Sequence, residues 1–325
     1  MKLFWITFLS LRNRYVIFYS SDLFNRGNMH ILMTGGTGFI GRAFVKHAIK
    51  EGHTITILSR AKRDSCDSIE FVRNLDEIDS KCQIDAIINL AGAPLGEKRW
   101  SESYKNELVE SRLGITEILI RFCKRLSKRP AVILSASAIG YYGSRGDEVL
   151  TEVSSAGANF SSKLCRDWER LWSNRLHPET RLCCLRFGVV FGRSGGALKQ
   201  LSQSFRFKVG TQIGTGNQWM SWVHLEDAVR AMIFLLDQKH LTGVFNVTSP
   251  KPVKVSELNA AIARRLPVYF HLRIPGKLIE GMLGEMATEL LLASQQVMPD
   301  ALSKAGFDFA YPELDAALKR ELGEG

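Results

Sequence analysis

Several features that would assign this chain to a function class are absent from its 325 residues. The six cysteines form no CxxC pair, and no cysteine or histidine cluster has the spacing of a zinc site. We therefore expect no bound metal, and we expect buried, reduced thiols in a cytoplasmic protein. The composition is otherwise that of a globular protein, with 45% hydrophobic and 23% charged residues, which argues against disorder.

Dense charge is also missing, although the net charge is +10. The basic residues are spread along the chain, without a basic run interleaved with aromatics, so we expect no nucleic-acid partner. The aromatic and aliphatic stretch before Ser20 is interrupted by Arg12 and Arg14. Its apolar runs are therefore too short to span a membrane, and we expect no membrane partner.

The strongest positive signal is a glycine-rich turn after His30–Thr34, a short apolar run typical of a strand. Gly35 permits a tight turn, Gly38 lets a pyrophosphate approach the backbone, and Gly41 lets the following helix pack closely on the sheet. The amides and the positive end of that helix then face the phosphates. We expect a dinucleotide cofactor to contact this turn through Gly35, Thr37, Gly38, Phe39, Ile40 and Gly41.

Residues 1–28 precede this turn and have no evident place in such a domain. Chains of this kind often begin with their first strand almost at the initiator methionine, and Met29 stands one residue before it. We therefore interpret residues 1–28 as an extension upstream of the true start or as a poorly packed tail. A degenerate signal or a transit segment is the alternative, although a convincing cleavage site is lacking.

Strands and helices alternate after the turn, which predicts a doubly wound parallel sheet of the Rossmann type. The expected strands are 54–58, 85–92, 131–135, 181–190 and 243–247, and the expected helices are 102–127, 160–176 and 226–236. From about Pro252 the pattern changes to a helix at 255–266, with Ser256 as its N-cap, followed by a proline-punctuated strand. We expect residues 29–250 to form the cofactor domain, and residues 251–325 a small C-terminal α+β domain that caps the substrate.

Several segments together resemble one family, the extended short-chain dehydrogenase/reductases. They are the turn above, Asn89–Gly92, the serine-rich strand end leading to Tyr142, Leu185–Gly192 and Trp222–Asp227. The chain is most similar to the atypical branch called "epimerase family protein". That likeness rests on Glu97–Trp100, Gly214–Gly216, Leu283–Glu285, Ser294–Gln296, Pro299 and Ala305–Phe307. The resemblance covers about residues 29 to 320.

The resemblance implies a nicotinamide cofactor, and the end of the second strand indicates which one. NAD-preferring relatives place an acidic residue there to bind the ribose 2′-hydroxyl. This chain has Ser59 and Arg60 instead, which can donate to a 2′-phosphate and neutralise it. A solvated loop arginine is the plainer interpretation of Arg60. We predict NADP(H) as the cofactor, with Leu90, Ala91 and Gly92 also contacting it.

The resemblance also implies a catalytic Ser, Tyr and Lys, the last two spaced as Tyr-x-x-x-Lys. Ser137 and Lys163 match two of these residues, and Lys163 would also bind the cofactor ribose. Asn159 occupies the tyrosine position and cannot exchange a proton near neutral pH. Tyr142 is the candidate substitute, and a packed aromatic wall is its alternative interpretation.

Two functions therefore remain open. One is an NADP(H)-dependent oxidoreductase or epimerase acting on a small polar, sugar-like substrate. The other is an NADPH-binding protein with little or no turnover and a structural or sensing role. Arg112 and Arg186 would either meet an anionic substrate group or form buried ion pairs. His224 is expected to be structural. The resemblance also allows a homodimer.

Overall fold

The computed structural model describes residues 27–193 and 195–323, so the predicted extension at residues 1–28 lies almost wholly outside the described chain. Its centre is a seven-stranded parallel sheet in the order β3-β2-β1-β4-β5-β7-β12. The strands are β1 (His30–Thr34), β2 (Thr54–Leu58), β3 (Ile69–Val72), β4 (Ala86–Asn89), β5 (Val132–Ala138), β7 (Arg181–Phe187) and β12 (Gly243–Val247). The predicted Rossmann-type fold is confirmed.

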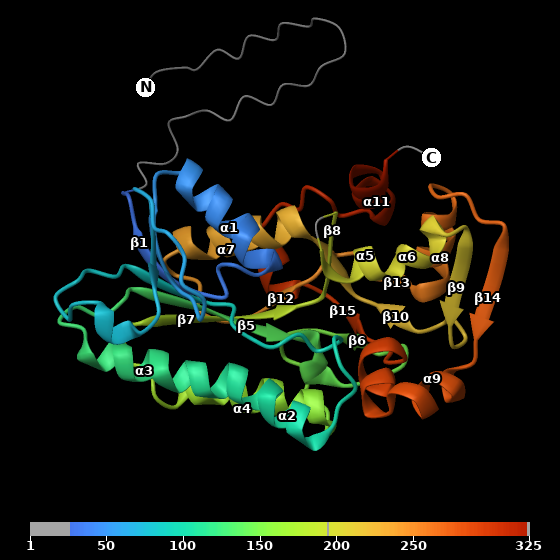
Figure 1. Ribbon diagram of the computed structural model, residues 1–325, viewed down its shortest axis with the longest axis horizontal. Helices are drawn as coiled ribbons and strands as arrows, with labels where there is room; N and C mark the ends of the chain where they lie inside the picture. Colours follow the sequence, from blue (N-terminus) through green and yellow to red (C-terminus); the bar gives the residue numbers. More distant parts are fainter. Residues whose placement is uncertain (1–26, 194, 324–325) are drawn as a thin grey trace, which may run out of the picture.

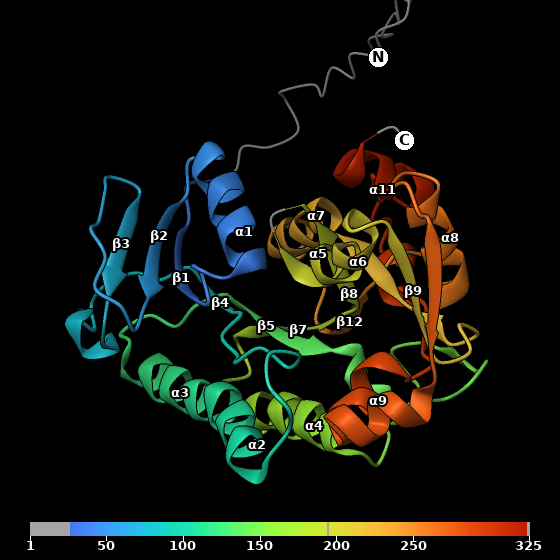
Figure 2. The same ribbon diagram turned by 45° about the vertical axis from the view of Figure 1, so that its right-hand side comes forward.

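Helices cover both faces of this sheet, which is why its strands are almost continuously apolar. On one face lie α1 (Phe39–Lys50) and α7 (Leu225–Asp237). The other face carries α2 (Glu102–Val109), α3 (Ile115–Arg125) and α4 (Phe160–Ser173), as Figures 1 and 2 show. Each face has its own hydrophobic core, and β4, at the middle of the sheet, is fully buried.

The strand order reverses between β1 and β4. From β1 the chain winds outward through β2 to β3, and it then returns to β4 on the other side of β1. In open α/β sheets, ligands bind at the carboxyl ends of the strands where the order reverses in this way. The fold therefore brings the end of β1 at Thr34 and the end of β4 at Asn89 to the expected cofactor site.

A second lobe stands beside the sheet and contains two stretches of the chain. The first stretch contributes α5 (Gly196–Leu201), α6 (Gln203–Arg206), β9 (Val209–Ile213) and β10 (Trp219–Met220). The second contributes β13 (Val253–Lys254), α8 (Val255–Ala263), β14 (Phe270–Ile274), α9 (Gly276–Leu283) and α11 (Leu314–Leu322), whereas α10 (Asp300–Lys304) packs on β12 of the main sheet. Strands β9 and β14 pair in parallel and β10 pairs with β13, so the lobe unites residues 196–220 with the C-terminal region.

Several short elements join the two lobes. Strand β15 (Gln296–Val297) pairs with β6 (Val149–Leu150), and β11 (Trp222–His224) pairs with β8 (Val189–Gly192). The single strand expected at 181–190 is therefore two strands, divided at Gly188, because β8 leaves the main sheet to pair with β11. No helix in the described ranges has both the length and the apolar character needed to cross a membrane.

Two helix expectations need correction. The helix expected at 102–127 contains a π-helical turn, Glu110–Gly114, between α2 and α3. Ser256 is not an N-cap, because α8 already begins at Val255 and the Ser256 amide donates to the Gly216 carbonyl at 2.9 Å. The Lys254 amide instead donates to Glu257 Oε2 at 3.1 Å, which closes the first turn of this helix.

Candidate cofactor and active site

The glycine turn has no room for side chains at two of its three glycines. Gly35 adopts a φ of +69°, and a Cβ there would lie 2.5 Å from the carbonyl of Leu90. A Cβ on Gly41 would lie 2.1 Å from the Gly35 carbonyl oxygen, which accepts the Gly38 amide at 2.9 Å. The turn therefore brings the ends of β1 and β4 and the start of α1 into backbone contact.

The start of α1 is prepared for an anion. Gly38 is the N-cap, no side chain accepts from the first amides, and the first turn carries no acidic residue. Helix α4 differs, because Asn159 Oδ1 accepts from the Ser162 amide at 2.9 Å. The carboxylate of Glu289 accepts from the amides of Phe160 and Ser161, at 3.1 and 2.8 Å. The residues at α1 therefore fit a dinucleotide diphosphate, whereas the start of α4 is already occupied.

The end of β2 carries no carboxylate that would exclude a 2′-phosphate. Ser59 follows the strand directly, and its hydroxyl donates to the Ala61 carbonyl at 2.9 Å. Arg60, Lys62 and Arg63 are all exposed. This arrangement fits NADP(H), but the individual contacts of Ser59 and Arg60 with a cofactor stay predictions.

A chain of buried hydrogen bonds holds the end of β4 in place. The Thr34 hydroxyl donates to Asn89 Oδ1 at 2.6 Å, and Asn89 Nδ2 donates to the Thr116 hydroxyl at 3.1 Å. The Ala91 amide also donates to the Thr34 hydroxyl, at 3.3 Å. The side chains of Thr34, Asn89 and Thr116 are buried and hydrogen-bonded to one another. The backbone of Leu90–Gly92 therefore has a defined position.

The loop after Gly92 is pinned by side chains from the α2–α3 helix and the residues before it. The Trp100 indole donates to the Leu95 carbonyl at 2.8 Å, and the Tyr104 hydroxyl donates to the Pro94 carbonyl. Ser111 Oγ accepts the Ala93 amide at 2.9 Å. Trp100 is buried against Phe160, so in this structure it is a core residue that also fixes the loop.

The two candidate catalytic hydroxyls belong to one buried polar network. Ser137 Oγ donates to Glu169 Oε1 at 2.6 Å, and Arg186 forms a two-pronged ion pair with the same carboxylate at 2.8 and 2.7 Å. The Tyr142 hydroxyl donates to Asn246 Oδ1 at 2.7 Å and accepts from Arg186 at 2.9 Å. Arg186 is therefore a buried ion-pair residue, which was one of the two expected roles.

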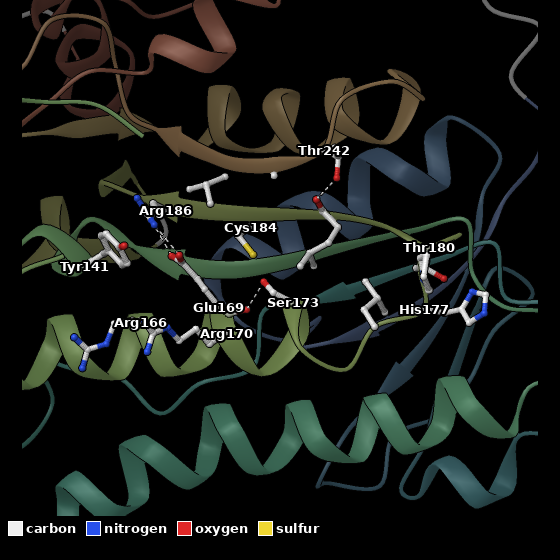
Figure 3. Close-up of a pocket in the computed structure, with 15 residues that line it drawn as sticks. Tyr141, Arg166, Glu169, Arg170, Ser173, His177, Thr180, Cys184, Arg186 and Thr242 are labelled. Carbon is white, nitrogen blue, oxygen red and sulfur yellow. Dashed lines mark hydrogen bonds and ion pairs between the residues drawn. The ribbon is translucent and has the colours of Figure 1, made fainter. Parts of the chain in front are cut away.

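Tyr142 is enclosed at this network, and its burial keeps the phenol protonated even though Arg186 favours the ionised form. The side chain is fully buried, and burial raises its pKa to about 12. Glu169, Arg186, Tyr141 and Cys184 also line a cavity of about 540 Å³ between α4 and the β7–β12 edge of the sheet (Figure 3). The Tyr141 ring lies over the Arg186 guanidinium at 3.4 Å. This environment favours a structural role for Tyr142 over proton transfer.

Lys163 is not brought into this network. It lies on α4 and is exposed, and among the residues described here it forms no hydrogen bond or ion pair with Ser137 or Tyr142. Asn159, four residues earlier, points its side-chain oxygen at the helix it caps. Asparagine is a favoured N-cap residue, which explains an asparagine where the resemblance led us to expect tyrosine. The catalytic roles of Ser137, Tyr142 and Lys163 stay predictions.

Sequence reasoning missed the C-terminal partners through which His224 and Asp227 attach the end of the chain. His224 caps α7 by accepting the Glu226 amide and pairs with Glu321 at 2.7 Å. Asp227 accepts the amides of Ala310 and Tyr311, each at 2.8 Å. The expected structural role of His224 agrees with this geometry. Neither Glu321 nor Glu289 carries a local signal, because each acts on a segment about 100 residues or more earlier in the chain.

Comparison with known proteins agrees with the fold and the glycine turn. A model of the NAD dependent epimerase/dehydratase family matches residues 31–248, and a domain of unknown function, DUF1731, matches residues 274–321. The epimerase family protein ML0860 of Mycobacterium leprae is 34% identical over 290 residues, which cover 89% of this chain and 94% of the relative. A chloroplastic homologue from Arabidopsis thaliana is 32% identical, over 94% of this chain and 90% of that protein.

One solved structure connects this fold with a cofactor. The human epimerase family protein SDR39U1 was crystallised with NADPH, and it superposes with a TM-score of 0.81 at 29% identity. The match covers 91% of this chain and the whole of the human chain. The predicted resemblance is thus confirmed: this chain belongs to the NAD dependent epimerase/dehydratase family, and within it resembles the SDR39U1-like epimerase family proteins that carry a C-terminal DUF1731 domain.

Proposed function

We propose that this protein binds NADP(H) at the carboxyl ends of β1, β2 and β4 and does not use the family's tyrosine-based proton transfer. The observation that carries the proposal is the uncapped start of α1, set in a turn where Gly35 and Gly41 leave no space for a Cβ. β2 is followed by Ser59 and Arg60 in place of an acidic residue, which supports NADP(H) as the cofactor over NAD(H). The human relative crystallised with NADPH supports the same choice.

The proton-transfer part rests on the two residues that would have to act. Asn159 caps α4 and carries no proton to give, and Tyr142 is buried with its pKa raised to about 12. Bound NADPH would supply a hydride, but Asn159 is not acidic, and the Tyr142 proton is held in a buried hydrogen bond to Asn246 with a raised pKa, which makes Tyr142 a poor proton donor. We therefore propose a cofactor-binding protein with little or no turnover through this pair, in a structural or sensing role.

A second candidate is an NADP(H)-dependent oxidoreductase or epimerase acting on a small polar, sugar-like substrate. It is favoured by Lys163, which is exposed on α4 and has the position of the family's lysine. A panel of aldehydes, ketones and nucleotide sugars tests it, with NADPH oxidation as the readout. Turnover that is lost in both Ser137→Ala and Lys163→Ala would establish the enzyme, and tight NADPH binding without turnover would favour the first candidate.

Cofactor choice has a sharper test in variants at the end of β2. Arg60→Ala should weaken NADPH binding by about tenfold or more, because a charge-assisted hydrogen bond contributes about 1.5–3 kcal/mol, and it should leave NADH binding unchanged. Ser59→Asp should reverse the preference, because its carboxylate repels the 2′-phosphate and accepts from a ribose hydroxyl. Arg121→Ala, an exposed change on α3, is the matched control. Equal NADPH and NADH affinities in the unaltered protein would refute the cofactor assignment.

A further inference from the structure

Arg112 is a shielded cation for which the described chain supplies no countercharge. It lies in the π-helical turn Glu110–Gly114, and burial lowers its pKa. Its guanidinium donates to the Leu108 carbonyl at 3.1 Å, the Ala93 carbonyl at 3.0 Å and, more weakly, Ser111 Oγ at 3.4 Å. No carboxylate of the described residues lies within ion-pairing distance. Buried charges in proteins are normally paired, so this arrangement requires an explanation.

The other ionisable groups around Arg112 do not resolve the imbalance. The two that act on it are the Cys165 thiol and the Tyr104 phenol. Burial raises the pKa of Cys165 to about 11 and raises that of Tyr104 above its ordinary value, so both are neutral at pH 7. The third neighbour is the Trp168 ring, 5.6 Å from the guanidinium carbon, which offers only a cation–π contact.

Two other arginines show how this protein satisfies such a charge when the role is purely structural. Arg186 has the carboxylate of Glu169. Arg181 donates to the carbonyls of Leu235 and Leu236, in the last turn of α7, where the helix dipole supplies negative charge. Arg112 has neither a paired carboxylate nor carbonyls at a helix C-terminus. The helical carbonyl that it contacts, that of Leu108, lies in the middle of the continuous α2–α3 helix.

The position of Arg112 connects it to the candidate site. A Cβ on Gly92 would lie 2.9 Å from the Arg112 guanidinium carbon, so this cation touches the backbone directly after β4. Its Nε–H has no acceptor among the residues that the structure covers, and unlike Nε of Arg166 and Arg265 it is not sealed from solvent. An inserted π-turn is rare and frequently occurs at functional sites. The unpaired Nε edge of this guanidinium therefore lies beside Gly92, close to the end of β4.

We propose that Arg112 binds the carboxylate or phosphate group of a second ligand, a small organic anion held beside the cofactor. This inference rests on the proposed NADP(H) site and adds the charge class of its substrate or effector. The free amides of α1, which follow β1, can bind the cofactor diphosphate. Arg112 lies beside the end of β4, across the point where the strand order reverses, so the diphosphate does not require it. An ordinary neutral aldehyde or ketone would leave this cation unpaired.

The test uses the full-length protein saturated with NADPH. Inorganic phosphate and acetate are titrated separately, and the melting temperature of the complex reports binding of each anion. We expect a saturable rise with at least one anion in the unaltered protein. Arg112→Met should weaken that anion's binding by at least about tenfold, Arg112→Lys should weaken it less, and Arg121→Met should leave it unchanged. All variants should keep their NADPH affinity within about threefold.

The outcomes separate the two proposals. If the unaltered protein fails to bind NADPH, the proposed function falls. If it binds NADPH and Arg112→Met binds the anion as well as before, the inference is overturned. It is also overturned if Arg112→Met loses NADPH affinity, because Arg112 would then serve the cofactor. Should Arg112→Met not fold, crystals of the unaltered NADPH complex soaked in selenate decide the question. An anomalous peak beside Arg112 supports the inference, and its absence there overturns it.

Discussion

The glycine at position 41 offers the most direct check of the turn that defines this molecule. In the variant Gly41→Ala the new Cβ would lie 2.1 Å from the Gly35 carbonyl oxygen and 2.8 Å from the Gly36 Cα. Both contacts are with backbone atoms, so no side-chain rotation can relieve them. Helix α1 must therefore move away from the β1–β4 junction, at a cost of about 1–3 kcal/mol of folding free energy.

The same movement displaces the α1 amides from the position that we assign to the cofactor phosphates. We expect Gly41→Ala to lower the urea midpoint and to weaken NADPH binding by more than about tenfold, since a lost hydrogen bond to a charged group contributes about 1.5–3 kcal/mol. Cofactor fluorescence gives the affinity, and unfolding in urea gives the stability.

Gly281→Ala is the matched control. Position 281 lies inside α9, where a Cβ would have no heavy atom within 4 Å, so alanine should raise stability by about 0.4–1 kcal/mol and leave NADPH binding unchanged. If Gly41→Ala bound NADPH like the unaltered protein and unfolded at the same urea concentration, the close packing of α1 on the turn would not govern this site, and the argument would fail.

Three further predictions concern the polar network and the α4 cap. Asn159→Ala should cost about 1 kcal/mol of stability in urea unfolding, because Asn159 accepts an α4 amide, and a loss below the error of the fit would contradict that role. Glu169→Ala should cost about 3–5 kcal/mol, because it strands the buried Arg186 charge, whereas the exposed Glu179→Ala should change stability by less than about 0.5 kcal/mol. The folded-state pKa of Tyr142 lies above its unfolded value of about 10, so its contribution is complete below pH 10 and is lost as pH rises toward 12. Alkaline unfolding should therefore steepen in that range, and Tyr142→Phe should remove the steepening.

The sheet and the glycine turn at its carboxyl end could be predicted from local sequence patterns. Strands β2 and β12 have the predicted bounds, because each is a short apolar run flanked by turn residues. The glycine spacing predicted a tight turn at Gly35 and close packing of the helix at Gly41, and the crowding at both positions agrees with this. These features depend on residues within about ten positions of one another, so periodicity and turn chemistry are sufficient to find them.

Other parts of the site could not be predicted from the sequence, because they depend on contacts with residues far away in the chain. The α2–α3 helix was expected to be regular, and no spacing signals the π-turn that places Arg112 against Gly92. Ser137 was predicted from its place at a strand end, but its hydroxyl direction depends on Glu169, which is 32 residues later. Residues 196–220 were assigned to the cofactor domain at 29–250, yet strands β9 and β10 within them pair with C-terminal strands.

The sequence by itself determined the parallel α/β fold, the glycine turn and the absence of an acid after β2, because each is a property of a short contiguous segment. Only the tertiary structure decided which charges are satisfied. It buried Arg186 against Glu169, capped α4 with Asn159 and the distant Glu289, and left the start of α1 and the Arg112 cation without anions among the residues it describes. The physical reason is that desolvation and ion pairing depend on which side chains meet in three dimensions.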